Sequence, residues 1–300
     1  MKFRWTSVAW TIAYLLLLLS LSTPLLIITS LFMVIPAVVL FTTLNTRQFI
    51  IHILPVWLIV GLISPVYVLI AAYLILPALV MGRWYKKRAS AKTTLLAGII
   101  TILGEFLLLL FLGKTLFQFD LYNYVNEVLK VTPMIGLNMG DLGLTSEEID
   151  KISLMTVQVI PMTLIISSSM IAVITHSIVR PILNSMNYAV PKLRPMRDWR
   201  LPRSFILYYA VGFILLLLFS GPDTDNGFMI MISANLLPLL QLAFKLQAIG
   251  FLFFVAHEKK WSKVFPVLLA VPILFLPSLW IIGVVDLLFP LRERVAKSKR

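Results

Sequence analysis

Two long stretches near the N-terminus contain no Asp, Glu, Lys or Arg, and this feature constrains the fold more than any other. Arg4 and Arg47 are separated by 42 such residues, and Arg47 and Arg83 by 35 more. A helix needs about 20 mostly apolar residues to cross the hydrocarbon core of a bilayer, so each stretch is long enough for two spans. Similar apolar runs continue to the end of the chain. The sequence therefore predicts an all-α integral membrane protein, a polytopic helical bundle.

Composition supports this class and excludes several others. Charged residues make up 13% of the 300 residues, whereas a soluble domain has about 25%. The net charge of +13 comes from Lys and Arg in short connections between apolar runs, a pattern typical of cytoplasmic loops, so we predict no nucleic-acid partner. The chain has no Cys, which excludes disulfides, thiolate catalysis and Cys-based metal sites.

Pro, Gly and Asn residues divide the apolar runs into nine candidate spans. They are residues 8–21, 25–44, 49–63, 66–81, 93–112, 152–179, 204–219, 228–256 and 264–288. Several have near 15 residues, which is about 22 Å of helix against a core of about 30 Å. We therefore expect about nine spans, within a range of eight to ten, some of them short or broken. They form a single transmembrane domain, residues 1–300, with a five-span N-terminal half (8–112), an extracytoplasmic segment (113–151) and a C-terminal half (152–300).

The distribution of Lys and Arg predicts the orientation. Residues 82–92 contain five basic residues and no acid, and residues 180–203 contain six against Asp198 alone. Residues 113–151 contain three basic residues against six acids, and residues 220–227 contain only Asp223 and Asp225 as charged groups. Because basic loops remain inside, the first two segments and the N-terminus are expected in the cytoplasm, and the acid-rich segments outside.

The end of the chain conflicts with a simple count of nine spans. A single final span would export the basic tail, which contains Arg292, Arg294, Lys297, Lys299 and Arg300. Three explanations are open: residues 264–288 form a hairpin at Pro272 or Pro277, residues 228–256 break near Lys245, or the tail is an exception to the charge rule. The sequence does not choose among them.

A helix start is predicted in the outer segment. Thr145 and Glu148 have the spacing of a capping box and stand just before Ile149, Ile152 and Leu154. We expect a helix to begin there and to continue into the membrane.

Several short motifs resemble those of a known family when their order and spacing are taken together. They are Thr94-Leu95-Leu96-Ala97-Gly98, Leu142-Gly143-Leu144-Thr145-Ser146-Glu147-Glu148, Arg197-Asp198-Trp199-Arg200-Leu201-Pro202-Arg203, Gln247-Ala248-Ile249-Gly250, and Ile282-Gly283-Val284-Val285-Asp286 before Arg292. With these motifs nearly the whole chain resembles the YybS-like family of uncharacterised bacterial membrane proteins. The resemblance implies a multi-pass protein of the bacterial cell membrane with no established activity. The first five segments also resemble the substrate-binding subunits of energy-coupling-factor vitamin transporters, which is an analogy of fold.

Two ionisable residues interrupt long apolar runs and are candidates for function. Glu105 and Lys245 each cost about 2.5 to 3.5 kcal/mol at membrane depth on insertion scales. Asn235, Gln241 and Lys245 fall on one helix face at about 100° per residue, and such a stripe is expected to face the protein interior. One interpretation is a solute or ion site lined by Glu105, Asn235, Gln241 and Lys245. The other is an ion pair of Glu105 with Lys245 that joins two helices.

A basic, proline-rich segment is the second candidate. It contains Arg194, Arg197, Trp199, Arg200 and Arg203. One interpretation is contact with anionic lipids, to which each basic residue contributes about 1 kcal/mol. The alternative is a docking surface for a cytoplasmic protein.

No motif for catalysis, cofactors or metals is found. His257-Glu258 begins like a zinc-protease motif, but that motif requires a second His where Trp261 stands. We therefore expect no enzyme, catalytic residue, cofactor or metal site. Two functions remain: capture or transport of a small solute, in the manner of a binding subunit, or a non-catalytic membrane scaffold that docks a signalling or envelope-assembly partner.

Overall fold

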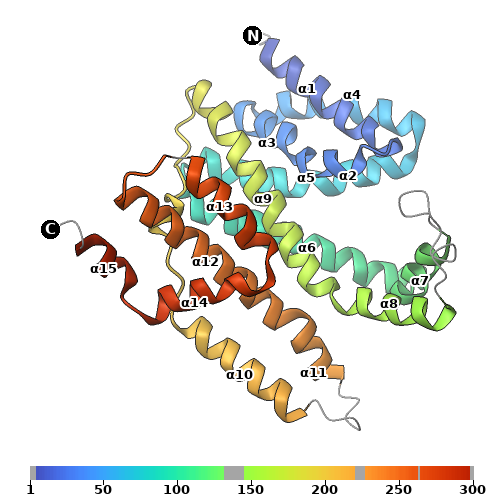
Figure 1. Cartoon of the computed structure of the whole chain (residues 1–300). Coiled ribbons are helices and arrows are strands. Elements are labelled where there is room, and N and C mark those ends of the chain that lie inside the picture. Colours follow the sequence, from blue (N-terminus) through green and yellow to red (C-terminus); the bar gives the residue numbers. More distant parts are fainter. Residues whose placement is uncertain (1–4, 132–144, 220–226, 263, 298–300) are drawn as a thin grey trace. The chain divides into compact units, whose positions relative to one another are not determined.

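The computed structural model describes residues 5–131, 145–219, 227–262 and 264–297, and within these ranges all regular secondary structure is helical. The chain forms two compact units (Figure 1). Unit 1 contains Met1–Phe119 and Thr163–Leu193, and unit 2 contains Asp120–Met162 and Arg194–Arg300. The division expected from the sequence, at 8–112, 113–151 and 152–300, stays a prediction. The two units are defined by packing and have other boundaries. Several residues discussed above lie outside the described ranges, namely Leu142, Gly143, Leu144, Asp223, Asp225, Lys299 and Arg300.

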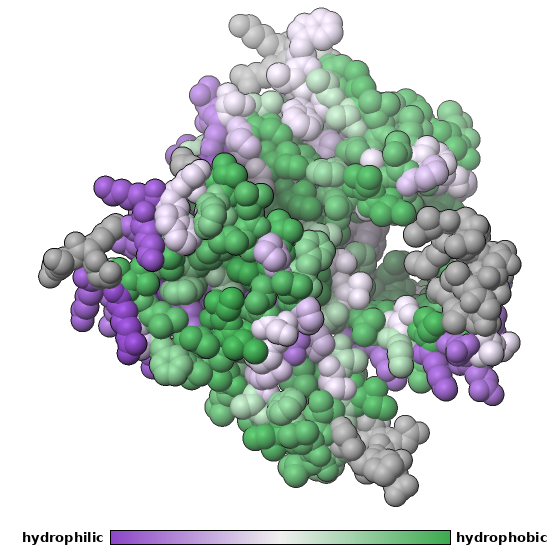
Figure 2. All heavy atoms as spheres, in the orientation of Figure 1, coloured by the Kyte–Doolittle hydropathy of each residue, from purple (hydrophilic) through white to green (hydrophobic). Residues whose placement is uncertain are grey.

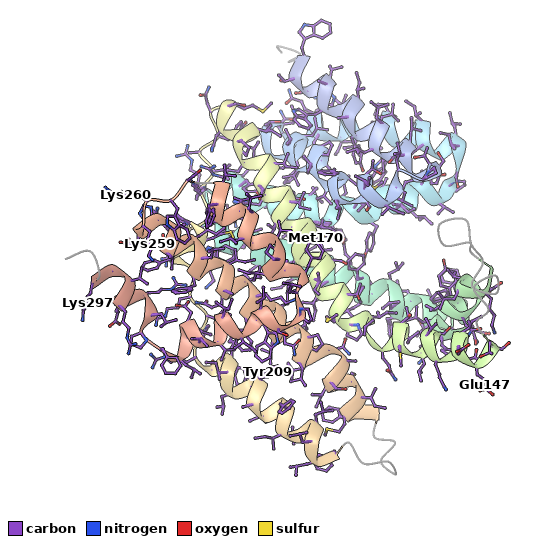
Figure 3. The ribbon with its side chains drawn as sticks, in the orientation of Figure 1. Glu147, Met170, Tyr209, Lys259, Lys260 and Lys297 are labelled. Atoms are coloured by element: carbon purple, nitrogen blue, oxygen red, sulfur yellow. The ribbon has the colours of Figure 1, made fainter. Side chains whose placement is uncertain are left out.

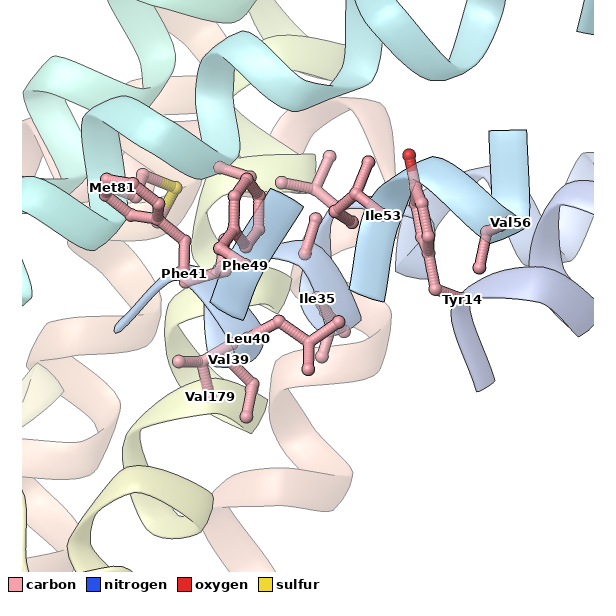
Figure 4. Packing of buried hydrophobic residues seen from close by; sticks show 14 of the residues in the cluster. Tyr14, Ile35, Val39, Leu40, Phe41, Phe49, Ile53, Val56, Met81 and Val179 are labelled. Carbon is pink, nitrogen blue, oxygen red and sulfur yellow. The ribbon is translucent and has the colours of Figure 1, made fainter. Parts of the chain in front are cut away.

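Unit 1 is built around a short central helix. Its elements are α1 (Trp5–Leu19), α2 (Leu26–Thr29), α3 (Val34–Thr43), α4 (Thr46–Ile63), α5 (Pro65–Lys86), α6 (Ala91–Phe117) and all but the first turn of α9 (Ile160–Ser185). Nine of the ten residues of α3 are buried, which is typical of a helix that is apolar on all sides. Figure 4 shows its Val39, Leu40 and Phe41 packed among side chains of neighbouring helices.

Polar contacts hold the basic connections of unit 1 at one end. The Lys86 ammonium donates to the carbonyl of Leu44 over 3.1 Å, and the Tyr188 hydroxyl donates to the carbonyl of Thr43 over 3.3 Å. These bonds satisfy carbonyls that the end of α3 leaves without helical partners. The end of α5 and the chain after α9 therefore meet beside the turn that precedes Arg47. These three parts of the chain share one end of unit 1.

Small residues allow close contact between α6 and α9. A Cβ atom at Gly98 would lie 2.8 Å from the Met81 sulfur and 3.5 Å from the Cβ of Ala172. Close approach at small residues is the usual way in which membrane helices associate. One turn further along α9, His176 is 1% exposed, and its Nδ1 lies 2.8 Å from the Tyr85 hydroxyl.

Unit 2 begins with a hairpin of α7 (Leu121–Val131) and α8 (Ser146–Gln158). The predicted capping box is confirmed: the Thr145 hydroxyl accepts from the Glu148 N–H, and the Glu148 carboxylate accepts from the Thr145 N–H over 2.7 Å. Asn126 of α7 donates to Asp150 over 2.7 Å and to the Ser153 hydroxyl over 3.0 Å. After α8, α9 begins at Ile160.

The other helices of unit 2 pack around α12 (Leu237–Glu258). They are α10 (Ser204–Phe219), α11 (Gly227–Met231), α13 (Val264–Phe275), α14 (Trp280–Leu288) and α15 (Leu291–Lys297), and a π-helical turn at Ile232–Leu236 joins α11 to α12. Tyr209 of α10, Phe244 of α12 and Trp280 of α14 form an aromatic cluster with ring centroids 4.9 to 6.1 Å apart.

The last apolar run is a bent pair of helices. The axes of α13 and α14 meet at 111° across a break at Pro277. The carbonyl of Leu274, near the end of α13, contacts Lys245 of α12. From there α14 runs along α12 in the same direction, because Gly283 faces Phe244 and Asp286 faces Gln247. The chain thus returns towards the end of unit 2 at which α13 began, which agrees with the hairpin alternative at Pro277.

Among the described residues, seven helices are long and apolar enough to cross a bilayer, or eight if the bent pair counts as one span. The predicted helical membrane class is confirmed, but a count of nine spans is not. Two predicted spans are not among the seven: Ser204–Phe219, whose 16 residues give about 24 Å of helix, and residues 264–288, which form the pair bent by 111°. Figure 2 shows hydrophobic side chains over exposed faces of both units, for example Leu62 at 88% exposure. Such faces suit contact with lipid.

Candidate functional site

Glu105 lies on the buried face of α6. The other buried residues of this helix are Ala91, Thr94, Leu95, Gly98 and Ile102, and their spacing of three and four residues defines one stripe. Glu105 continues this stripe and ends it, since no residue of α6 after Glu105 is buried. The helical register therefore directs the carboxylate towards packed protein, as the sequence predicted for an interior polar residue.

The Glu105 carboxylate has no hydrogen-bond partner among the described residues. The residue is 5% exposed, and both carboxylate oxygens are buried. Tyr73 of α5 interacts electrostatically with Glu105, and its buried hydroxyl also has no partner in the described chain. Leaving a buried ionised group uncompensated is costly. A proton, a cation or a donor group beside the Glu105 carboxylate would compensate it.

Lys245, by contrast, has a clear local acceptor. Its ammonium donates to the carbonyl of Leu274 over 2.8 Å. This carbonyl belongs to the last turn of α13, where carbonyls lack helical partners and carry partial negative charge. Lys245 thus caps the helix end that the break at Pro277 exposes. Gln241, one turn earlier on α12, donates to the Tyr209 hydroxyl of α10 over 3.0 Å.

Asn235 bonds the backbone groups at the break between α8 and α9. In a continuous helix the Met162 N–H would donate to the Gln158 carbonyl. Instead the Asn235 carboxamide lies between them: it donates to Gln158 over 2.7 Å and accepts from Met162 over 2.8 Å. An inserted side chain of this kind is a recognised cause of a break in a helix. Its position in a π-helical turn directs the amide at this gap.

The four residues expected to line one site thus have different environments. Asn235, Gln241 and Lys245 belong to unit 2 and bind α8 and α9, α10 and α13 respectively, whereas Glu105 belongs to unit 1. The joint site and the pairing of Glu105 with Lys245 stay predictions. Of the four, Glu105 is the residue whose polar atoms have no partner in the described chain.

A buried network in unit 2 was not predicted from the sequence. Asp286 is completely buried and forms an ion pair with Arg292, whose Nη2 lies 2.9 Å from the carboxylate and whose Nε lies 3.1 Å from it. Gln247 donates to the same carboxylate over 2.5 Å. A charged group with this many donors is well compensated. Its parts lie in two of the motifs that carry the family resemblance, and this was the available signal.

This network also fixes the basic segment at residues 194–203. Gln247 accepts from the Leu201 N–H over 2.8 Å, and Arg292 donates to the Arg197 carbonyl over 2.7 Å. A Cβ at Gly250 would approach the Met196 carbonyl to 3.0 Å, so glycine there allows the segment to lie close to α12. The Trp199 indole donates to the Arg194 carbonyl over 2.8 Å. Arg194, Arg200 and Arg203 are exposed, and Arg197 lies 3.0 Å from His257.

The arrangement places the C-terminal tail beside this basic segment. Arg292 precedes the described tail residues Arg294 and Lys297, and its guanidinium joins Asp286 to the Arg197 carbonyl. The tail and residues 194–203 therefore share one end of unit 2. Within the described residues, no group of three or more His, Asp or Glu side chains has the geometry of a metal site.

Comparisons with known proteins agree with the family suggested by the motifs. A family model described as "Predicted membrane protein (DUF2232)" matches residues 11–287. The chain is 23% identical over 229 residues to a Bacillus subtilis (strain 168) protein named "Uncharacterized protein YybS", and the match covers 72% of each chain. No solved structure matches. The predicted resemblance to the YybS-like family is confirmed.

Proposed function

The chain belongs to the DUF2232 family of predicted membrane proteins, and from this membership and the buried carboxylate of unit 1 we propose that it captures a small positively charged solute or ion within the membrane. The observation that carries the proposal is Glu105, which is 5% exposed and has no partner for either oxygen among the described residues. Ionisable groups at membrane depth mark ion and substrate paths more often than they serve as packing.

Charge balance indicates the class of ligand. One carboxylate contributes a single negative charge, and the Tyr73 hydroxyl adds an uncharged oxygen. A monovalent cation or a protonated amine would neutralise the pair. A divalent ion would keep an uncompensated positive charge beside a single buried carboxylate, which is costly. The ligand is therefore a monovalent cation or a small amine.

Thermal unfolding of the purified full-length protein tests this function. A ligand that binds only the native state raises stability by about 2.7 kcal/mol at one hundred times its Kd. We expect NaCl, KCl or ethanolamine hydrochloride to raise the Tm in a saturable manner, relative to choline chloride at equal ionic strength. Glu105→Gln should abolish the increase and Tyr73→Phe should weaken it.

The control is Glu147→Gln, which removes an exposed carboxylate and should leave the cation response intact. If no cation of this panel raises the Tm of the wild type, or if Glu105→Gln still responds, capture at Glu105 is wrong.

A cycle of Glu105→Gln and Lys245→Met separates capture from a structural ion pair. We expect the two losses of stability to add within about 0.5 kcal/mol, as for side chains that share no partner, since Lys245 already donates to Leu274. Coupling well above that limit would make Glu105 a structural partner of Lys245, and capture at Glu105 would then lose its support.

The second candidate function is a membrane scaffold that docks a cytoplasmic protein. A separate observation favours it, namely the fixed conformation of residues 194–203 against Gln247, Gly250 and Arg292. The two functions use different residues, so one protein can perform both.

A further inference from the structure

The four arginines of residues 194–203, here called the arginine segment, are spaced three residues apart. They are Arg194, Arg197, Arg200 and Arg203. Met196–Asp198 is a 3₁₀ turn, and its flanking residues Pro195 (φ −54°, ψ 144°) and Trp199 (φ −72°, ψ 134°) are extended, close to polyproline II geometry. Both conformations have three residues per turn. Arg194, Arg200 and Arg203 of this segment are exposed, and Arg197 is half-buried.

Side chains of unit 2 hold this segment in place. Its backbone is bonded at two points by buried or half-buried side chains, Gln247 at Leu201 and Arg292 at Arg197. Those two side chains are themselves fixed by Asp286. A prearranged loop loses little conformational entropy when it binds. Attraction to a lipid surface depends on charge and needs no such fixed conformation.

Trp199 adds a second distinction between a protein and a lipid partner. An indole that anchors a protein at the headgroup level has an apolar ring and a polar N–H directed to the interface. The Trp199 N–H donates instead to the Arg194 carbonyl, within the segment itself. Its hydrogen bond therefore stabilises the shape of the segment and is not available to a headgroup.

More positive charge surrounds the segment in unit 2. Arg197 contacts His257 at the end of α12, and Lys259 and Lys260 follow directly. Figure 3 shows Lys259, Lys260 and Lys297 projecting from the same edge of unit 2. Asp198, Glu258 and Glu293 are the acids of these elements in the described chain, and Asp198 lies 3.7 Å from Arg197. The positive charge is in excess.

We propose that the arginine segment docks an acidic segment of a cytoplasmic protein, with Arg194, Arg200 and Arg203 binding carboxylates. Guanidinium groups form two parallel hydrogen bonds with a carboxylate, which an ammonium cannot do. Arg292 and Gln247 act as positioning residues that hold the segment. The proposal rests on the scaffold role and is independent of capture at Glu105.

Binding of a fluorescein-labelled decaglutamate peptide to the full-length protein tests this surface. The protein is placed in nanodiscs of phosphatidylcholine, and peptide anisotropy gives the affinity. The triple variant Arg194→Lys, Arg200→Lys, Arg203→Lys keeps the charge and should bind about tenfold more weakly. The matched control, Arg83→Lys with Arg88→Lys, makes the same chemical change at exposed positions of unit 1 and should bind like the wild type.

A second variant tests how the arginine segment is held, without changing its charge. Gln247→Met removes the acceptor of the Leu201 N–H and should weaken peptide binding several-fold, provided that its thermal unfolding confirms a folded protein. The triple lysine variant still tests the proposal if Gln247→Met does not fold.

Phosphatidylglycerol nanodiscs distinguish the lipid interpretation. If the lysine variant binds the peptide as tightly as the wild type, and anionic lipid displaces the peptide from both alike, the segment is a lipid contact and the proposal is overturned. Absence of peptide binding by the wild type would also overturn it. Neither result changes the expected response of Glu105 to cations.

Discussion

Asp286 in unit 2 and Glu105 in unit 1 are both buried carboxylates, but their surroundings differ. Asp286 is completely buried and receives hydrogen bonds from Arg292 and Gln247. Glu105 is 5% exposed and receives none from the described residues. The first arrangement compensates its charge within the protein, whereas the second needs something else to do so. The contrast separates a carboxylate that organises the fold from one that can bind a ligand.

The basic residues of the two units also differ in the groups that they bond. In unit 2, Arg292 connects Asp286 to the arginine segment, so the buried charge determines the position of an exposed loop. In unit 1, Lys86 satisfies the end of α3 by bonding Leu44 and is not directed to the polar interior residue. In unit 2 the buried charge therefore holds a surface segment in place, whereas in unit 1 the buried carboxylate is left for an internal site.

The largest expected effect concerns the side of the tail, because Arg292 can bond the Arg197 carbonyl only if the chain returns at Pro277. The chain lacks Cys, so single-Cys labelling with an impermeant reagent is direct. Arg294→Cys and Arg200→Cys should react only after the cells are permeabilised, and Glu147→Cys should react in intact cells. If Arg294→Cys reacts in intact cells while Arg200→Cys does not, α13 and α14 together cross the membrane.

The second largest effect is expected when each carboxylate is replaced by its amide, because the two units should then lose different amounts of stability. Asp286→Asn leaves Arg292 without a countercharge and should cost about 3 to 5 kcal/mol, whereas Glu105→Gln removes an uncompensated charge and should cost less than about 1 kcal/mol. Thermal unfolding of the purified variants measures both. Replacing Arg292 by Leu together with Asp286→Asn should recover much of the loss. Equal losses at Asp286 and Glu105 would remove the distinction between them.

Helix packing beside the two carboxylates should also differ. A Cβ at Gly283, one turn before Asp286, would overlap the backbone carbonyl of Phe244, and nothing lies within 4 Å of a Cβ at Gly104, next to Glu105. Gly283→Ala should therefore cost about 1 to 3 kcal/mol through overpacking, while Gly104→Ala should leave stability unchanged. Denaturant titration compares the two. A neutral Gly283→Ala would indicate that α12 and α14 are not in close contact.

The smallest effect is a pH dependence at an exposed carboxylate. The Thr145 backbone N–H, and then the Thr145 hydroxyl, hold the pKa of Glu148 below the ordinary value of 4.5. A lowered native pKa adds stability that is present above the unfolded value and is lost as the pH falls through the native value. The protection of the first-turn amides of α8 against hydrogen exchange, relative to the intrinsic rate at each pH, should therefore decrease in acid below pH 4.5. Glu148→Gln should abolish this dependence, and Glu147→Gln should retain it.

The class of the protein and several local features could be read from the sequence because they depend on neighbouring residues. The charge-free runs predict spans since hydrocarbon excludes charge whatever the fold. Thr145 and Glu148 predict a helix start because the capping box is closed within four residues. The family resemblance was also accessible from short motifs, and the family model matches residues 11–287.

The tertiary structure decided how polar residues are satisfied. Asn235, Gln241 and Lys245 share one helix face in the sequence pattern, yet each binds a different element, and Asp286 meets Gln247 only because the chain bends by 111° at Pro277. Helical periodicity states which side of a helix a residue occupies, but not which helix covers that side. The partners of a buried polar group come from distant parts of the chain, and packing alone brings them within hydrogen-bond distance.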